Sequence, residues 1–234
     1  MHVRCNLLAG ISALLLSSSG VAAPQADLQA QGEWMAHFYE RPEPDHLPQW
    51  LKEVAGTRGL EKGHFRFPIM VFVAEVAKRY PGKVGSWCAD LAGLPSSQRA
   101  SIAWSFKNAG ALDARCTDGL AADDLAKLQA ARPYSPLSKT PTTPGDLDML
   151  WSVFMATGNE AAVNLIVDVL RIPVPDKPEP GSVQILLLNG AARWSLGSNA
   201  QQHPAVRAIL ERRAAASQGL LKEQLDAILH KAKG

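Results

Sequence analysis

The chain has 234 residues, of which 47% are hydrophobic and 20% are charged. Its 24 basic and 22 acidic residues nearly balance and are scattered along the sequence, so we expect no nucleic-acid partner. This length and hydrophobic content suffice for one domain with a sizeable core.

The N-terminal residues have the three-part layout of a secretory signal peptide. Arg4 precedes an apolar core over residues 7–16, and small residues follow it. That core is shorter than the roughly 20 residues that span a bilayer, so we expect cleavage and no stable membrane span afterwards. We assign residues 1–23 to the signal peptide, with Ala22 and Ala26 as alternative cleavage positions. The mature protein is then expected to be periplasmic or secreted.

The mature chain keeps two cysteines, Cys88 and Cys116, because Cys5 lies in the predicted signal peptide. An even number of cysteines in an oxidising compartment favours a bridge, so we predict a disulfide between them. Two buried free thiols are the alternative.

A helical period runs through the N-terminal part of the mature chain. Pro68 is expected to begin a helix that ends before Pro81. A buried strand competes over residues 68–80, but the length of the run without a turn signal favours a helix. The helices expected in this part cover residues 27–40, 46–54, 68–80, 83–93, 95–110 and 121–131.

A connection rich in Pro, Ser and Thr follows at residues 133–145 and marks a candidate boundary between two halves of one α-helical domain, residues 27–234. Residues 146–170 then contain two apolar runs. The first is apolar almost all round, whereas the second has one polar stripe. Gly158 is expected to end the first helix and Asn159 to cap the second.

The remaining segments are also predicted to be helical, apart from the proline-rich residues 172–181, which predict an extended crossing. Asn189-Gly190 is a type I′ hairpin signal. The apolar period continues on both sides of it, however, and favours a single helix that begins at Ser182. Amphipathic helices complete the chain after Pro204.

These elements predict an all-α fold of stacked antiparallel helical hairpins, a degenerate array in the manner of HEAT or tetratricopeptide repeats. An irregular helical bundle is the alternative. The expected hairpins cover residues 68–92, 146–171 and 182–216.

The run LDMLWSVFMATGNEAAVNLIVDVL at residues 147–170 resembles a segment of uncharacterised exported α-helical proteins of proteobacteria. In those proteins a W..F.ATG turn joins two helices. The resemblance implies a structural turn and carries no activity across to this chain.

Common catalytic signatures are missing from the sequence, which has no HExxH, CxxC, P-loop or GxSxG motif. The densest polar segment is residues 37–46, in which His37, Glu40 and His46 are the candidate site residues. Its histidines and carboxylates could bind a divalent metal or supply an acid and a base. A solvated connector punctuated by prolines explains the segment better, so we expect no cofactor and no metal ion.

Two further groups of residues have structural explanations. Asp146 and Asp148 resemble a metal-binding pair, but acidic residues at the start of a helix also complement its positive end. Trp34 and Trp50 are the tryptophans that we expect to be exposed. Those at apolar positions of helices are expected in the core: Trp87, Trp104, Trp151 and Trp194.

Two functions remain compatible with these observations. The first is an exported helical scaffold or binding protein that engages a protein partner in the bacterial envelope, for example a toxin that it neutralises. The second is an envelope-located hydrolase that acts on cell-wall or lipid material, with residues 37–46 as its site. The missing catalytic motifs favour the first.

Overall fold

Every regular element in the described part of the chain is a helix, which confirms the all-α prediction. The predicted signal peptide and most of the predicted extended segment lie outside that part. Within it, no helix is both long enough and apolar enough to cross a membrane. The computed structural model describes residues 32–57, 60, 63–174 and 182–232.

The helices follow one another with short connections, and 3₁₀ turns occur in several of these connections. Residues 32–36 form a helical turn ahead of them. The α-helices are α2 (Leu47–Gly56), α3 (Gly63–Arg79), α4 (Val84–Asp90), α5 (Ser96–Asn108), α6 (Ala122–Ala130), α7 (Pro144–Thr157), α8 (Glu160–Val169), α9 (Ser182–Gln202), α10 (Pro204–Ala215) and α11 (Gly219–Lys231).

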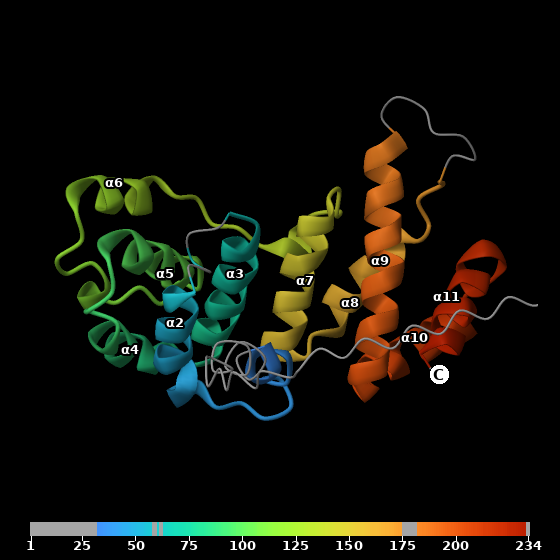
Figure 1. Ribbon diagram of the computed structural model, residues 1–234, viewed down its shortest axis with the longest axis horizontal. Helices are drawn as coiled ribbons and strands as arrows, with labels where there is room; N and C mark the ends of the chain where they lie inside the picture. Colours follow the sequence, from blue (N-terminus) through green and yellow to red (C-terminus); the bar gives the residue numbers. More distant parts are fainter. Residues whose placement is uncertain (1–31, 58–59, 61–62, 175–181, 233–234) are drawn as a thin grey trace, which may run out of the picture.

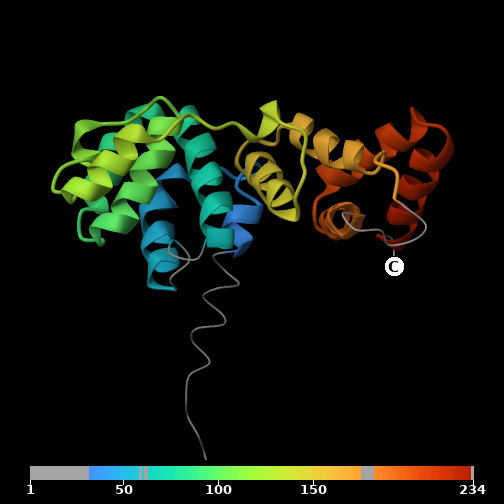
Figure 2. The same ribbon diagram turned by 90° about the horizontal axis from the view of Figure 1, so that it is seen from above.

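The helices lie side by side in an elongated row (Figures 1 and 2). Helices α2, α4, α5 and α6 lie toward one end, α9, α10 and α11 lie toward the other, and α3 packs along α7 between them. One apolar cluster runs through the whole row and includes Phe106 in α5, Phe154 in α7 and Leu225 in α11. The connection at residues 133–145 leads from α6 in the first group to α7, which lies between the groups. That the row is a degenerate repeat array stays a prediction.

Helix α3 begins earlier than expected, at Gly63, so that Pro68 lies inside it. The proline removes its own N–H from the helix ladder, but the helix continues on both sides of it. The following run from Met70 to Ala77 is buried at almost every position, because α5 and α7 cover α3 from two sides. Burial on both sides explains why this segment also resembled a buried strand.

The predicted disulfide is confirmed. Cys88 in α4 is bonded to Cys116 in the 3₁₀ turn Ala114–Cys116, with a Cα–Cα separation of 4.9 Å. Beside it, Trp87 is buried and its ring lies 6.0 Å from that of Phe106. The bridge therefore links the short helix α4 to the loop that leaves α5.

The turn between α7 and α8 is formed as predicted. Gly158 has φ +71° and ends α7, and Asn159 accepts a hydrogen bond from the backbone N–H of Ala161 to cap α8. At the start of α7, Thr143 and Asp146 form a reciprocal capping box. The acidic start of this helix therefore has the structural role that we expected for Asp146.

The tryptophan predictions are partly wrong. Trp50 is only 2% exposed and Trp34 is half-buried, because both rings pack with Phe72 in an aromatic cluster. Trp194, expected in the core, is 75% exposed. Helical periodicity identifies an apolar face but does not determine whether another helix covers that face.

Helix α9 is continuous through Asn189 and Gly190, which confirms the preference for a helix over a hairpin turn.

Two ion pairs join α10 to α8: Arg212 to Glu160 at 2.7 Å and Arg213 to Asp168 at 2.5 Å. Such surface pairs contribute at most about 1 kcal/mol each, so they orient the helices more than they stabilise them.

Candidate functional site

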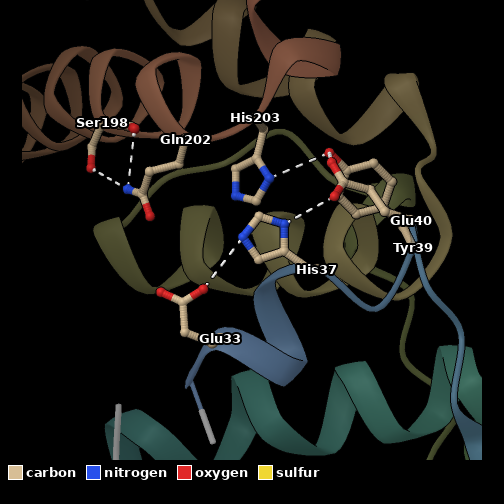
Figure 3. A network of polar contacts seen from close by, with 7 residues as sticks. All are labelled: Glu33, His37, Tyr39, Glu40, Ser198, Gln202 and His203. Atoms are coloured by element: carbon tan, nitrogen blue, oxygen red, sulfur yellow. Dashed lines mark hydrogen bonds and ion pairs between the residues drawn. The ribbon is translucent and has the colours of Figure 1, made fainter. Parts of the chain in front are cut away.

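Polar side chains from two segments that are distant in the sequence meet in one cluster (Figure 3). His37, Tyr39 and Glu40 belong to the turns that follow the first helical residues, and His203 lies at the break between α9 and α10. We refer to these four residues as the polar cluster. It joins the first described segment to the C-terminal group of helices.

The local sequence explains how these residues are positioned. Phe38 is fully buried, and this anchors the turn that carries its neighbours His37 and Tyr39. His203 is the N-cap of α10, followed by Pro204, and its own N–H donates to the Asn199 carbonyl at 2.8 Å. A proline at the first position of a helix separates α10 from α9, and His203 is held at the resulting corner.

Glu40 is the centre of the contacts within the polar cluster. Its Oε2 lies 3.0 Å from His37 Nδ1, and its Oε1 accepts a hydrogen bond from the Tyr39 hydroxyl at 2.7 Å. The same hydroxyl lies 3.3 Å from His203 Nδ1, and the two imidazole rings are 4.8 Å apart. On the opposite side of its ring, His37 Nε2 lies 3.5 Å from Glu33.

The electrostatics of the polar cluster keep its members in different protonation states. The hydrogen bond from Tyr39 lowers the pKa of Glu40, so this carboxyl is ionised at neutral pH. Burial and the hydrogen bond to Glu40 raise the pKa of Tyr39, which keeps its hydroxyl protonated. Burial, followed by the nearby His37, lowers the pKa of His203. His203 is 1% exposed and is a neutral imidazole at pH 7.

The sequence identified part of this cluster. His37 and Glu40 are in contact, but His46 does not join them: it is exposed, and its ring packs 5.2 Å from that of Trp34. His203 was missed because it is far away in the sequence. The one local signal for it was the His-Pro pair at a helix start, which indicates a cap and not a ligand.

The polar cluster contains the side-chain types that hold metal ions. Among the described residues, His37, Glu40 and His203 form a group whose potential ligand atoms all lie within 4.8 Å of one another. Imidazole nitrogens and carboxylate oxygens are the donors found in many zinc sites.

A second candidate region is apolar and lies on α9. Val183, Leu187 and Trp194 are 57%, 60% and 75% exposed. At 100° per residue they lie on one face of the helix, and we refer to them as the α9 stripe. Single exposed apolar residues are common, whereas an aligned row that includes a tryptophan is typical of an interaction surface.

A groove of about 490 Å³ between α9 and α11 adjoins the α9 stripe. Trp194 forms one wall, and the small residues Gly190 and Gly197 open its floor along α9. Arg193 and Lys231 give the groove basic edges. In its lining, the Oε1 atom of Gln224 is buried and accepts no hydrogen bond from the described residues.

A third region is a cavity of about 620 Å³ beside α3, α5 and α7. Its walls are mainly apolar and include Phe67, Trp104 and Met149. Asp148 is exposed overall but lines the rim of this cavity, and partial desolvation there raises the pKa of its carboxyl. Asp148 therefore differs from the capping residue Asp146, although both lie in α7.

Comparison with known proteins gives no match for this chain, whether with family models, with curated proteins or with solved structures.

Proposed function

We propose that this chain is an exported helical binding protein that engages a protein partner in the bacterial envelope through the α9 stripe. The observation that carries this proposal is the exposure of Trp194, 75%, on the same helix face as Leu187 and Val183. Tryptophan is enriched among the residues that dominate binding energy at protein interfaces.

The surroundings of the stripe indicate the chemistry of the partner. The groove beside Trp194 is open enough for the apolar side of a helix, since Gly190 and Gly197 have no side chains to fill it. Arg193 and Lys231 favour acidic residues at the edges of the bound segment. We therefore propose an amphipathic helical segment with acidic flanks as the part of the partner that binds.

The envelope location is supported by the signal-like N-terminal residues and by the Cys88–Cys116 disulfide, which persists in oxidising compartments. A toxin neutralised by this protein is one class of partner that would be encountered there.

Trp194→Ala tests the proposal. Native envelope fractions are passed over the wild-type chain, the variant and the control Leu112→Ala, which removes an exposed leucine outside the α9 stripe. The identified partner is then purified and titrated against all three chains. We expect Trp194→Ala to weaken binding by at least about 30-fold, equivalent to about 2 kcal/mol, and Leu112→Ala to leave it unchanged.

Two results would contradict this proposal. One is a partner whose affinity is the same for the wild type and Trp194→Ala. The other is self-association of the purified wild-type chain that Trp194→Ala abolishes in sedimentation experiments, because the stripe would then be an interface between copies of this chain.

The second proposal, an envelope hydrolase, has support from the neutral imidazole of His203 beside the charged Glu40. A neutral imidazole and a carboxylate are the usual groups for general acid and base catalysis. However, the groove and the large cavity are lined by other residues, and His46 is not part of the cluster. The geometry therefore favours the binding protein.

A further inference from the structure

We infer that the polar cluster is a binding site for a divalent cation of the zinc class, with His37, Glu40 and His203 as its three protein ligands. This inference is independent of the α9 stripe and of the function proposed for it. It differs from the sequence-based expectation, which considered His46 in place of His203 and favoured no metal ion.

The donor atoms match the preferences of zinc. Two imidazole nitrogens and one carboxylate are a common protein ligand set for zinc, and they leave a fourth position for water or another ligand. Among the described residues, the cysteines Cys88 and Cys116 are bonded to each other and offer no thiolate.

The distances require only small movements. Tetrahedral ligands at about 2.1 Å from zinc lie roughly 3.4 Å from one another. His37 Nδ1 and Glu40 Oε2 are already 3.0 Å apart, and the three potential ligand atoms lie within 4.8 Å of one another. The ligand atoms would therefore have to approach by no more than about 1.4 Å, and the exposed Glu40 and the half-buried His37 can move toward an ion while the buried His203 stays in place.

Outer contacts orient these ligands as metal sites require. A metal-bound imidazole commonly donates its other N–H to a carboxylate, and Glu33 lies 3.5 Å from His37 Nε2, away from Glu40 (Figure 3). The Tyr39 hydroxyl holds the other oxygen of Glu40 at 2.7 Å. Tyr39 is therefore a positioning residue, and Glu33 has the same role for His37.

The location of the site indicates what the ion would do. His37 and Glu40 belong to the first described turns, whereas His203 fixes the corner between α9 and α10. An ion bound by all three would link these segments, which are distant in sequence, through stronger bonds than the present hydrogen bonds. Metal binding should therefore raise the thermal stability of the chain.

The experiment uses the mature full-length chain prepared without a histidine tag and stripped with a chelator. Zinc chloride is titrated calorimetrically, and bound zinc is counted after gel filtration. We expect one zinc ion per chain and a higher melting temperature with zinc. Glu40→Gln keeps the size of the side chain and should lower the affinity more than about 100-fold, since loss of outer-shell partners alone costs roughly 10- to 100-fold.

The control is His46→Ala, which removes a histidine of the same segment that lies outside the cluster and should leave zinc binding unchanged. His37→Ala and His203→Ala should abolish binding, and Tyr39→Phe should weaken it about tenfold. Because His203 is buried, circular dichroism checks that His203→Ala is folded. If it is not, the Glu40→Gln variant, which changes an exposed side chain, tests the zinc site in its place. Less than one zinc per chain, full affinity in Glu40→Gln or loss of binding in His46→Ala would each overturn the inference.

Discussion

The two ends of the row of helices are held together in different ways. At one end, the seven-residue helix α4 is linked covalently to the loop after α5 by Cys88 and Cys116. At the other end, α9, α10 and α11 are longer and depend on packing around fully buried leucines such as Leu196, Leu210 and Leu225. Trp87 and Val84 of α4 are also buried, and the disulfide adds to this packing a covalent link that α9, α10 and α11 do not have.

The two ends also differ in the apolar residues that they expose. At the disulfide end, Leu112 is a single exposed leucine at 39%, whereas α9 carries the stripe that includes Leu187 and Trp194. The opposite side of α9 already packs on other helices through residues such as Leu188 and Leu196. Because this packing holds α9 in place, its exposed face is available for binding.

Removing the disulfide should give the largest effect and should act mainly on one end. For Cys88→Ala with Cys116→Ala, the chain-entropy estimate for a loop of this separation is a loss of about 3 to 4 kcal/mol in the free energy of unfolding. Denaturant titration measures the total, and amide exchange shows where protection is lost. We expect the largest loss in α4 and around Cys116. An equal loss throughout α9 to α11 would contradict the contrast between the two ends.

The junction between the two ends should be the next most sensitive place. Gly158 has φ +71°, and an added Cβ would lie 3.3 Å from Cδ2 of Tyr39. Gly158→Ala should therefore cost about 1 to 2 kcal/mol, from the left-handed backbone and the close contact. Gly190→Ala is the matched control, because it lies within α9 with no atom near the added Cβ. There the same change should stabilise the chain by about 0.5 to 1 kcal/mol, and denaturant titration compares the two.

Local chemistry made most helices and several of their ends predictable from the sequence, although α3 begins at Gly63 and not at Pro68. Gly158 and Asn159 form the turn after α7 as expected, and α9 continues through Asn189 and Gly190 because the apolar period continues. The disulfide followed from the number of cysteines and the expected compartment. Each of these predictions depends on residues that are close in sequence or that have one available partner.

The candidate sites depend on tertiary contacts and were less predictable. His203 joins His37 and Glu40 because the corner between α9 and α10 packs near the first turns, and no local pattern encodes that contact. Trp194 lies at an apolar position of its helix, as a core residue would. Its exposure depends on whether another helix covers it, and that depends on the arrangement of the whole row.

The smallest expected effect concerns Asp148, an acidic residue that lines the cavity beside α3 and α7. Burial raises its pKa, so ionisation is less favourable in the folded chain than in the unfolded chain. The resulting loss of folding stability is absent below about pH 3.9, the pKa of an aspartate in the unfolded chain, and it is complete at neutral pH. Asp148→Asn should therefore raise the melting temperature slightly at pH 7, and the gain should vanish in strongly acidic buffer.

Asp146→Asn is the matched control, because it changes an acidic residue two positions earlier in the same helix. Burial opposes its ionisation, but hydrogen bonds from Thr142 and Thr143 lower its pKa overall. Asp146 therefore stabilises the fold at neutral pH, and this contribution is lost as the pH falls. Asp146→Asn should lower the melting temperature at pH 7, the opposite of Asp148→Asn. If both variants lowered it equally, ionised Asp148 would stabilise the fold at neutral pH as Asp146 does, and its pKa would not be raised by desolvation.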